Sequence, residues 1–169
     1  MQHLTLICSL SAAMLASACG SSSVSAPTAN VLRYSGTVSQ PAPGGFLVYK
    51  LAGAWTLNPD GSLLSGADTV TIVDATVYGV QGTTVMTLKT RCVGIKGKDA
   101  WAENEVVTTS NPGFAAVGSR SIVRLSLASG KPQGGGGPLE LWYPTGNVCV
   151  DRPAAMPAFD MPDGHLAFP

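Results

Sequence analysis

Short runs of alternating apolar and polar residues, separated by turn residues, extend along most of the chain. In RSIVRLSL at 120–127, Val123 and Leu125 alternate with Arg124. Successive side chains of a β-strand point to opposite faces of the sheet, so a period of two predicts strands with one buried face. Turn signals such as NPDG at 58–61 divide the runs, and no stretch has the period of an amphipathic helix. The pattern therefore predicts an all-β fold.

These runs predict about eight or nine short strands in a single domain at residues 31–169. We expect the strands at 31–39, 46–57, 69–77, 83–93, 100–109, 120–127, 139–144, 147–150 and 164–168. Alternation is expected to place Met86, Leu88 and Cys92 on one strand face, and the glycine-rich KPQGGGGP at 131–138 is expected to be a flexible hairpin tip. Such a series of strands is typical of an antiparallel β-sandwich or a small β-barrel, and the sequence leaves both open.

The charge balance argues against a nucleic-acid partner. Ten Lys and Arg residues are matched by ten Asp and Glu residues in the 169-residue chain, so the formal net charge is zero. A nucleic-acid-binding surface needs an excess or a stripe of basic residues. Only 12% of the residues are charged and 45% are hydrophobic, which favours a folded domain over a disordered one.

Residues 1–18 are predicted to be a signal peptide. The segment 4–18 carries no charge and is mostly apolar or small. It is shorter than the roughly 20 residues that cross a bilayer, and its length fits the apolar region of a signal peptide. Ala16, Ser17 and Ala18 also satisfy the small-x-small rule of ordinary signal peptidase.

Ser17 and Ala18, followed at once by Cys19, resemble the lipobox of a bacterial lipoprotein precursor. The resemblance implies that lipid is attached to Cys19, that the mature chain begins there, and that 19–30 is a flexible tether. The chain differs from the pattern at Ala16, where a lipobox usually has Leu, and it has no Lys or Arg at the start. Because Asp does not follow the cysteine, the family's sorting rules imply the outer membrane of a Gram-negative cell. The alternatives are a soluble secreted or periplasmic protein and a retained structural segment.

The remaining cysteines are expected to form one disulfide. Cys8 lies in the predicted leader and Cys19 is assigned to lipid, which leaves Cys92 and Cys149. Two cysteines in an oxidising envelope most simply pair. A two-thiol metal or redox site is the alternative, but two Cys and one His are too few ligands for a closed zinc site. No metal site and no cofactor are predicted.

The motifs CVGIKGKDAWAENEVVT at 92–108 and VGSRSIVRLSL at 117–127 precede the glycine-rich tip, a second Cys and a final strand led by Gly. Together they resemble a group of small exported bacterial domains of unknown function. The resemblance covers Arg91 to Phe168. It supports the β fold and the disulfide, and it implies no activity.

Glu103 and Glu105 share one face of a predicted strand, beside Trp101. Two carboxylates near an aromatic ring suit glycoside hydrolysis. Side chains on one strand project in parallel, however, and do not flank a bond from two sides. Ion pairing with Lys89 or Arg91 on the next strand therefore explains the two acids better.

No other residue set predicts catalysis. His165 is the one histidine after the leader, and we expect it to be solvated or at a strand end. The acids Asp60, Asp68, Asp160 and Asp163 are assigned to turns, and no calcium-loop motif accompanies them.

The candidate recognition surface consists of Trp101, Glu103, Glu105, Trp142 and Tyr143, with core packing as the alternative for the aromatic residues. We expect a lipid-anchored cell-envelope protein whose β domain has a non-enzymatic structural or binding role. Its partners would be the membrane, through the lipid, and an envelope protein or a small ligand. The alternatives are a carrier of an apolar ligand in a hollow barrel and a carboxylate-using enzyme in a barrel mouth.

Overall fold

The structure is a computed structural model that describes residues 30–169. The predicted signal peptide and Cys19 lie outside these residues, as does all of the predicted tether except Asn30. The strands are β1 (Asn30–Ala42), β2 (Gly45–Leu57), β3 (Leu63–Asp74), β4 (Thr84–Lys96), β5 (Asp99–Thr109), β6 (Arg120–Ser126), β7 (Gln133–Pro138), β8 (Phe159–Asp160) and β9 (His165–Ala167). The short helices are η1 (Thr76–Tyr78), α1 (Leu139–Trp142) and α2 (Val148–Asp151).

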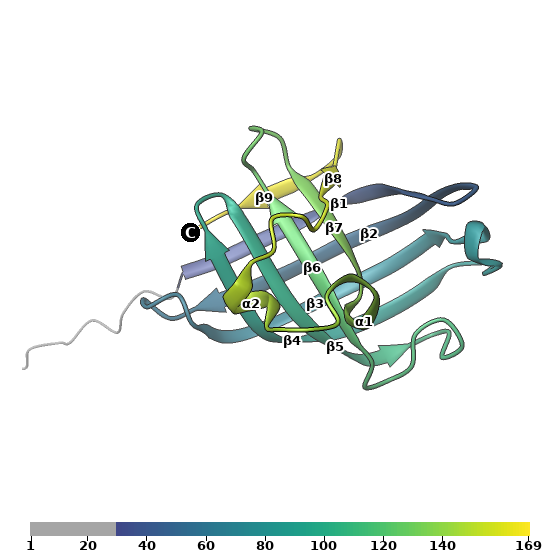
Figure 1. Cartoon of the computed structure of the whole chain (residues 1–169), viewed down its shortest axis with the longest axis horizontal. Coiled ribbons are helices and arrows are strands. Elements are labelled where there is room, and N and C mark those ends of the chain that lie inside the picture. Colours follow the sequence, from purple (N-terminus) through teal and green to yellow (C-terminus); the bar gives the residue numbers. More distant parts are fainter. Residues whose placement is uncertain (1–29) are drawn as a thin grey trace, which may run out of the picture.

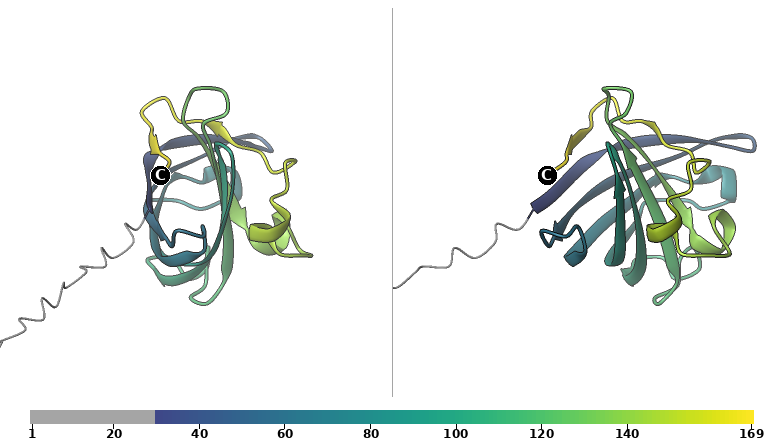
Figure 2. Two further views of the ribbon diagram at one scale, coloured as in Figure 1. Left: turned by 90° about the vertical axis from the view of Figure 1, so that its left-hand side faces the viewer. Right: turned by 60° about the vertical axis from the view of Figure 1, so that its left-hand side comes forward.

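All the strands belong to one antiparallel sheet with the order β8-β7-β6-β5-β4-β3-β2-β1-β9. Each strand from β1 to β7 pairs with the next one along the chain, so the sheet is mainly a meander. It curls into a half-barrel (Figure 1), which is seen from its end in the left view of Figure 2. The predicted all-β domain is confirmed, and its form is a curled single sheet rather than a sandwich of two.

The C-terminal segment links the two edges of the curled sheet. β8 pairs with β7 at one edge, and β9 pairs with β1 at the other. Between these strands, Asp163 accepts hydrogen bonds from the backbone N–H and the hydroxyl of Thr37, each 2.7 Å long. Met161 turns its side chain into the core. The segment therefore covers the gap that the meander leaves open.

The inner face of the curled sheet forms the main hydrophobic core. Leu32, Val38, Trp55 and Leu125 are fully buried there and come from β1, β2 and β6. Tyr34 packs edge-on against Trp55, with 5.1 Å between the ring centroids. Because alternate residues of each strand point inward, the period-two pattern becomes an apolar inside and a mixed outside.

A second, smaller core lies on the outer face of the sheet, where α1 and α2 cover it (Figure 2, left view). Its members are Trp101, Ile122, Leu139, Val148, Cys149 and Met156. The Trp101 indole N–H donates to the Pro153 carbonyl oxygen over 3.2 Å. The Arg124 guanidinium lies 5.3 Å from the centre of the Trp101 ring and donates to the Ala154 carbonyl oxygen over 2.9 Å.

The prediction that Cys92 shares a face with Met86 and Leu88 is wrong. Met86 and Leu88 belong to the inner core, whereas Cys92 packs against the outer one. The cause is an irregularity in the pairing of β4 with β5, where Thr90 pairs with Asn104 and Cys92 with Glu103. An extra residue in one strand reverses the faces of all that follow it.

The glycine-rich segment is strand β7 and not a hairpin tip. Its glycines let other segments lie directly against the strand. A Cβ atom on Gly135 would be 2.4 Å from the Pro157 carbonyl oxygen, and one on Gly137 would be 2.3 Å from the Trp142 indole nitrogen. The absence of side chains is thus a packing requirement rather than a sign of flexibility.

The segments 139–144 and 147–150 were expected to be strands, and they contain the helical turns α1 and α2. The Asn147 side chain caps α2 by accepting hydrogen bonds from the backbone N–H groups of Cys149 and Val150, at 3.1 and 3.3 Å. A single turn is too short to show a helical period in the sequence. In the part of the chain that the structure describes, no helix is long and apolar enough to span a membrane.

Candidate ligand-binding cavity

One end of the half-barrel holds a cavity of about 410 Å³. Inward-facing side chains of the long strands supply one side of its wall: Leu51, Val70, Ile72, Met86, Leu88 and Val106. Pockets for small molecules usually measure about 300–1,000 Å³ and are lined mainly by apolar side chains. The cavity matches this description in size and in chemistry.

The register of the sheet brings these side chains together. Leu51 on β2 lies opposite Val70 on β3, and Val70 lies opposite Met86 on β4. Tyr49 lies opposite Ile72 one step nearer the cavity entrance. Residues in such cross-strand rows point to the same side of the sheet, so β2, β3 and β4 contribute to one continuous apolar wall.

The connections at this end form the entrance. Tyr78 of η1, Phe114 of the β5–β6 loop and Leu141 of α1 all line the cavity. η1 is fixed at its start by Asp74, whose carboxylate accepts from the Thr76 backbone N–H over 2.9 Å. In Figure 1, η1 lies at the right of the molecule and α1 and the β5–β6 loop at its lower right.

The wall contains few polar groups. The Tyr49 hydroxyl donates a 2.8 Å hydrogen bond to the Gln40 side-chain oxygen. Burial raises the pKa of Tyr49, so its hydroxyl stays protonated. The buried Ser121 hydroxyl lines the cavity and has no hydrogen-bond partner among the described residues. The oxygen itself is shielded from solvent, so it is an unpaired polar group within the wall.

Beyond the inner end of the cavity, a buried polar cluster fills the barrel. It takes one residue from each of five successive strands: Tyr34, Trp55, Asp68, Thr90 and Asn104. The Trp55 indole N–H donates to the Asp68 carboxylate over 2.9 Å, and the Thr90 hydroxyl donates to it over 3.5 Å. The Tyr34 hydroxyl and the Asn104 amide lie near the carboxylate without a well-formed hydrogen bond.

Burial dominates the electrostatics of Asp68. It raises the pKa of the carboxyl to about 6, although the polar groups around it act in the opposite direction. The assignment of Asp68 to a turn is therefore wrong, because this residue lies within β3 and is only 3% exposed. Asp68 is not among the residues that line the cavity.

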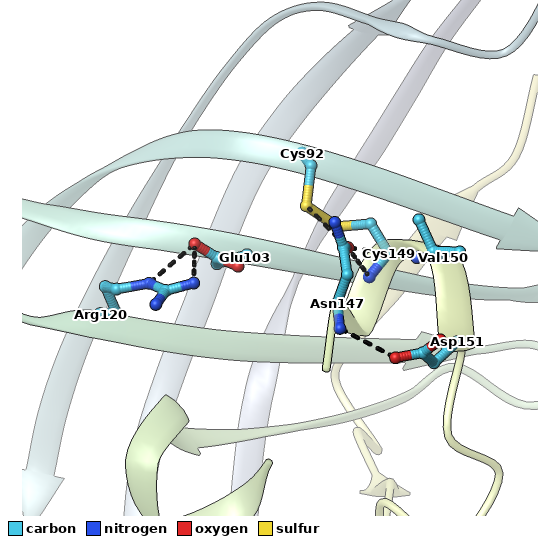
Figure 3. Close-up of a disulfide and its surroundings, with 7 residues drawn as sticks. All are labelled: Cys92, Glu103, Arg120, Asn147, Cys149, Val150 and Asp151. Carbon is cyan, nitrogen blue, oxygen red and sulfur yellow. Dashed lines mark hydrogen bonds and ion pairs between the residues drawn. A yellow bond between two sulfur atoms is a disulfide. The ribbon is translucent and has the colours of Figure 1, made fainter. Parts of the chain in front are cut away.

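Glu103 and Glu105 lie on the outer face of β5, away from the cavity. The Glu103 carboxylate accepts from the Arg120 guanidinium, with contacts of 2.9 and 2.7 Å, and Figure 3 shows this pair near the disulfide. Glu105 pairs with Arg91 of β4, as expected, whereas Glu103 pairs with Arg120 of β6 and not with Lys89 or Arg91. The two acids therefore do not meet across a substrate-sized cleft.

The predicted aromatic recognition residues do not form one exposed surface. Trp101 is buried beneath the segment around Pro153. Trp142 lines the cavity entrance. The Tyr143 hydroxyl donates to the Asp151 carboxylate over 2.9 Å. Only Trp142 is thus placed to contact a molecule in the cavity.

The predicted disulfide is present between Cys92 and Cys149, with 6.1 Å between the Cα atoms. It fastens α2 to the outer face of β4, as Figure 3 shows. His165 is exposed at the start of β9, which confirms the expectation of a strand-end histidine. Among residues 30–169, no group of three or more His, Cys, Asp or Glu side chains is arranged to hold a metal ion.

The cavity residues were not singled out from the sequence. Tyr49, Leu51, Val70 and Ile72 appear there as ordinary members of alternating runs. Alternation identifies the inward face of a strand but not whether the space in front of it is filled. Asp68 interrupts the inward-facing row of β3 and could have signalled a buried polar cluster, but the expected strand began at residue 69 and left it in a turn.

Comparison of the chain with protein-family models, with curated proteins and with solved structures finds no match. The fold and the cavity are therefore the basis for a function.

Proposed function

We propose that the half-barrel binds a small, largely apolar molecule in the cavity at its open end. The observation that carries the proposal is the cavity itself, whose volume is about 410 Å³ and whose wall is mainly aliphatic and aromatic. An apolar wall that faces water gains free energy when a ligand covers it, by about 25 cal/mol for each Å² removed from solvent.

The polar groups narrow the class of ligand. The Ser121 hydroxyl has no partner among the described residues, and leaving a buried hydroxyl unpaired is unfavourable. A ligand could pair with this hydroxyl only by displacing the atoms that shield it. The apolar wall is therefore the main guide, and we expect a ligand with a largely apolar body. The charged lining residues are Arg120, which pairs with Glu103, and Glu140. The rest of the wall carries no charge, so a mainly uncharged ligand fits best.

The cellular location of the protein is part of the same proposal. We propose a lipid-anchored envelope protein that is held to a bacterial membrane, with the outer membrane preferred, through Cys19. The Cys92–Cys149 disulfide supports export, because such bonds persist in oxidising compartments. The intact mass of the chain from fractionated cells tests this proposal. A chain that starts at Cys19 and carries acyl groups supports it, and an unmodified chain in the soluble fraction contradicts it.

Ligand binding is tested with the neutral fluorescent probe N-phenyl-1-naphthylamine. The variant Val70→Phe places a larger side chain on the cavity wall, and we expect the probe affinity to fall at least about tenfold. The matched control is Val73→Phe, because Val73 lies on the same strand but is exposed on the outer face. Equal affinities of wild type, variant and control, with both variants folded by thermal melting, would contradict the proposal.

The carboxylate-enzyme alternative has no comparable support. Glu103 and Glu105 lie outside the barrel in ion pairs with Arg120 and Arg91. The buried Asp68 does not line the cavity.

A further inference from the structure

Four large apolar side chains are exposed around the cavity entrance, and each comes from a different connection. They are Phe46 at the β1–β2 hairpin, Tyr78 of η1, Val117 of the β5–β6 loop and Leu141 of α1. Their exposed fractions are 56%, 53%, 64% and 76%. We call these residues the apolar rim.

The apolar rim is continuous with the cavity wall. Tyr78 and Leu141 line the cavity themselves. Phe46 is followed in the chain by the lining residue Leu47, and Val117 is preceded by the lining residue Ala116. The hairpin also reaches η1, since a Cβ atom on Gly45 would be 2.9 Å from the Val77 side chain. Exposed apolar surface around a cavity entrance indicates a surface that binds another apolar phase.

Charge is distributed unequally between the two ends of the half-barrel. The rim connections 41–46, 75–80, 110–119 and 138–146 contain one charged residue, Glu140, and the strand ends beside them add Asp74 and Arg120. The connections at the opposite end, 58–62, 96–99 and 127–132, contain Asp60, Lys96, Lys98, Asp99 and Lys131. Figure 1 shows the latter connections at the left and at the top of the molecule.

We propose that the apolar rim docks on the surface of a zwitterionic lipid bilayer, so that the cavity entrance faces the acyl chains. Few charges lie at the rim, and Arg120 and Asp74 beside it are engaged with Glu103 and Thr76, which limits the cost of moving charges toward hydrocarbon. Tyr78 and Trp142 have the amphipathic rings that are favoured at membrane interfaces. Side chains on four separate connections can each enter a fluid surface, whereas a rigid partner would have to match all four at once. The idea that a ligand passes between the membrane and the cavity rests on the proposed function. Docking itself can be measured without a ligand.

Trp142 provides a reporter at the entrance. It lines the cavity, whereas Trp55 in the inner core and Trp101 in the outer core are 0% and 2% exposed and do not line it. Phosphatidylcholine vesicles with brominated acyl chains quench only indoles that come close to the chains. With the full chain, we expect these vesicles to quench the fluorescence, and we expect the variant Trp142→Phe to lose that quenching. Contact made through the N-terminal region alone would not quench Trp142.

Rim variants and matched controls test the surface. We test the double variant Phe46→Ser/Leu141→Ser in the full chain. We expect the lipid concentration that gives half of the maximal Trp142 quenching to rise at least about tenfold. The control Leu64→Ser/Val150→Ser changes two side chains that are 59% and 67% exposed away from the rim, and we expect it to behave as wild type. Absence of quenching in the wild type, or equal loss in both double variants, would overturn the docking proposal.

Binding of N-phenyl-1-naphthylamine without vesicles separates this proposal from the proposed function. Probe binding without vesicle quenching would overturn docking and leave the cavity proposal intact. Vesicle quenching without probe binding would support docking and contradict the cavity proposal.

Discussion

The Trp55 indole nitrogen donates a 2.9 Å hydrogen bond to the Asp68 carboxylate inside the half-barrel. The two residues lie diagonally across the pairing of β2 with β3, because Trp55 pairs with Gly66 and Asp68 pairs with Gly53. Each large polar side chain thus faces a glycine. A slip of one residue would turn the donor and the acceptor to opposite faces, so the bond favours one register of the sheet.

The first prediction concerns the two glycines that make room for this pair. A Cβ atom on Gly53 would be 2.2 Å from the Asp68 carboxylate, and one on Gly66 would be 2.6 Å from the Thr90 hydroxyl. We expect Gly53→Ala to lower the free energy of unfolding by about 2–3 kcal/mol through overpacking. Chemical denaturation measures the change. Gly113→Ala is the control, because its nearest neighbour is 3.4 Å away. Equal effects of the two substitutions would show that the steric account is wrong.

The second prediction concerns pH. The pKa of Asp68 is about 6 in the folded state, whereas an unfolded Asp has a pKa near ~3.9. The folded state therefore binds the proton more tightly, and Asp68 contributes stability that grows as the pH falls from about 6 toward 4. At higher pH that contribution is lost, and the difference amounts to about 3 kcal/mol.

This pH dependence is isolated by comparison with Asp68→Asn. The carboxyls of Asp60, Asp74 and Asp163 have lowered pKa values, so their contributions fall at acidic pH in both proteins alike. As the pH is lowered from 7 to 4, we expect the free energy of unfolding of the wild type to rise relative to that of the variant. Denaturation at each pH measures the difference. Parallel stability profiles would rule out Asp68 as the titrating group.

The third prediction concerns the disulfide. Cys92 and Cys149 are 57 residues apart, and closing a loop of that length stabilises a domain by about 4 kcal/mol in the loop-entropy description. We expect reduction to lower the melting temperature and to shift the fluorescence of Trp101, which lies beneath the segment that follows α2. The variant Cys92→Ala/Cys149→Ala serves as the control and should not respond to reductant. An unchanged melt of the wild type on reduction would contradict the prediction.

The fourth prediction concerns the polar pair in the cavity wall. Tyr49→Phe removes the 2.8 Å hydrogen bond to Gln40 and leaves its side-chain oxygen without that donor. We expect a loss of about 1–2 kcal/mol in the free energy of unfolding. In the double variant Tyr49→Phe/Gln40→Leu, both partners become apolar, so most of this loss should be recovered. A double-mutant cycle measures the coupling, and additive losses would refute it.

The alternation of apolar and polar residues was enough to predict the β class and the long strands. In 120–127, for example, Val123 and Leu125 face the core as expected, because the two-residue period of a strand is a local property of the backbone. The pairing of Cys92 with Cys149 was also predictable, since two cysteines remained once Cys8 was assigned to the leader and Cys19 to lipid.

Features that depend on non-local contacts were not predictable in this way. The side of the sheet on which Cys92 lies depends on the pairing of β4 with β5, and the glycines of β7 are explained only by the Pro157 and Trp142 atoms that lie against them. Asp68 is buried because four other strands surround it. The cavity likewise depends on how strongly the sheet curls, because the curl sets the distance between inward-facing side chains of different strands. Local sequence sets which way a side chain points, but the curvature of the whole sheet decides what it meets there.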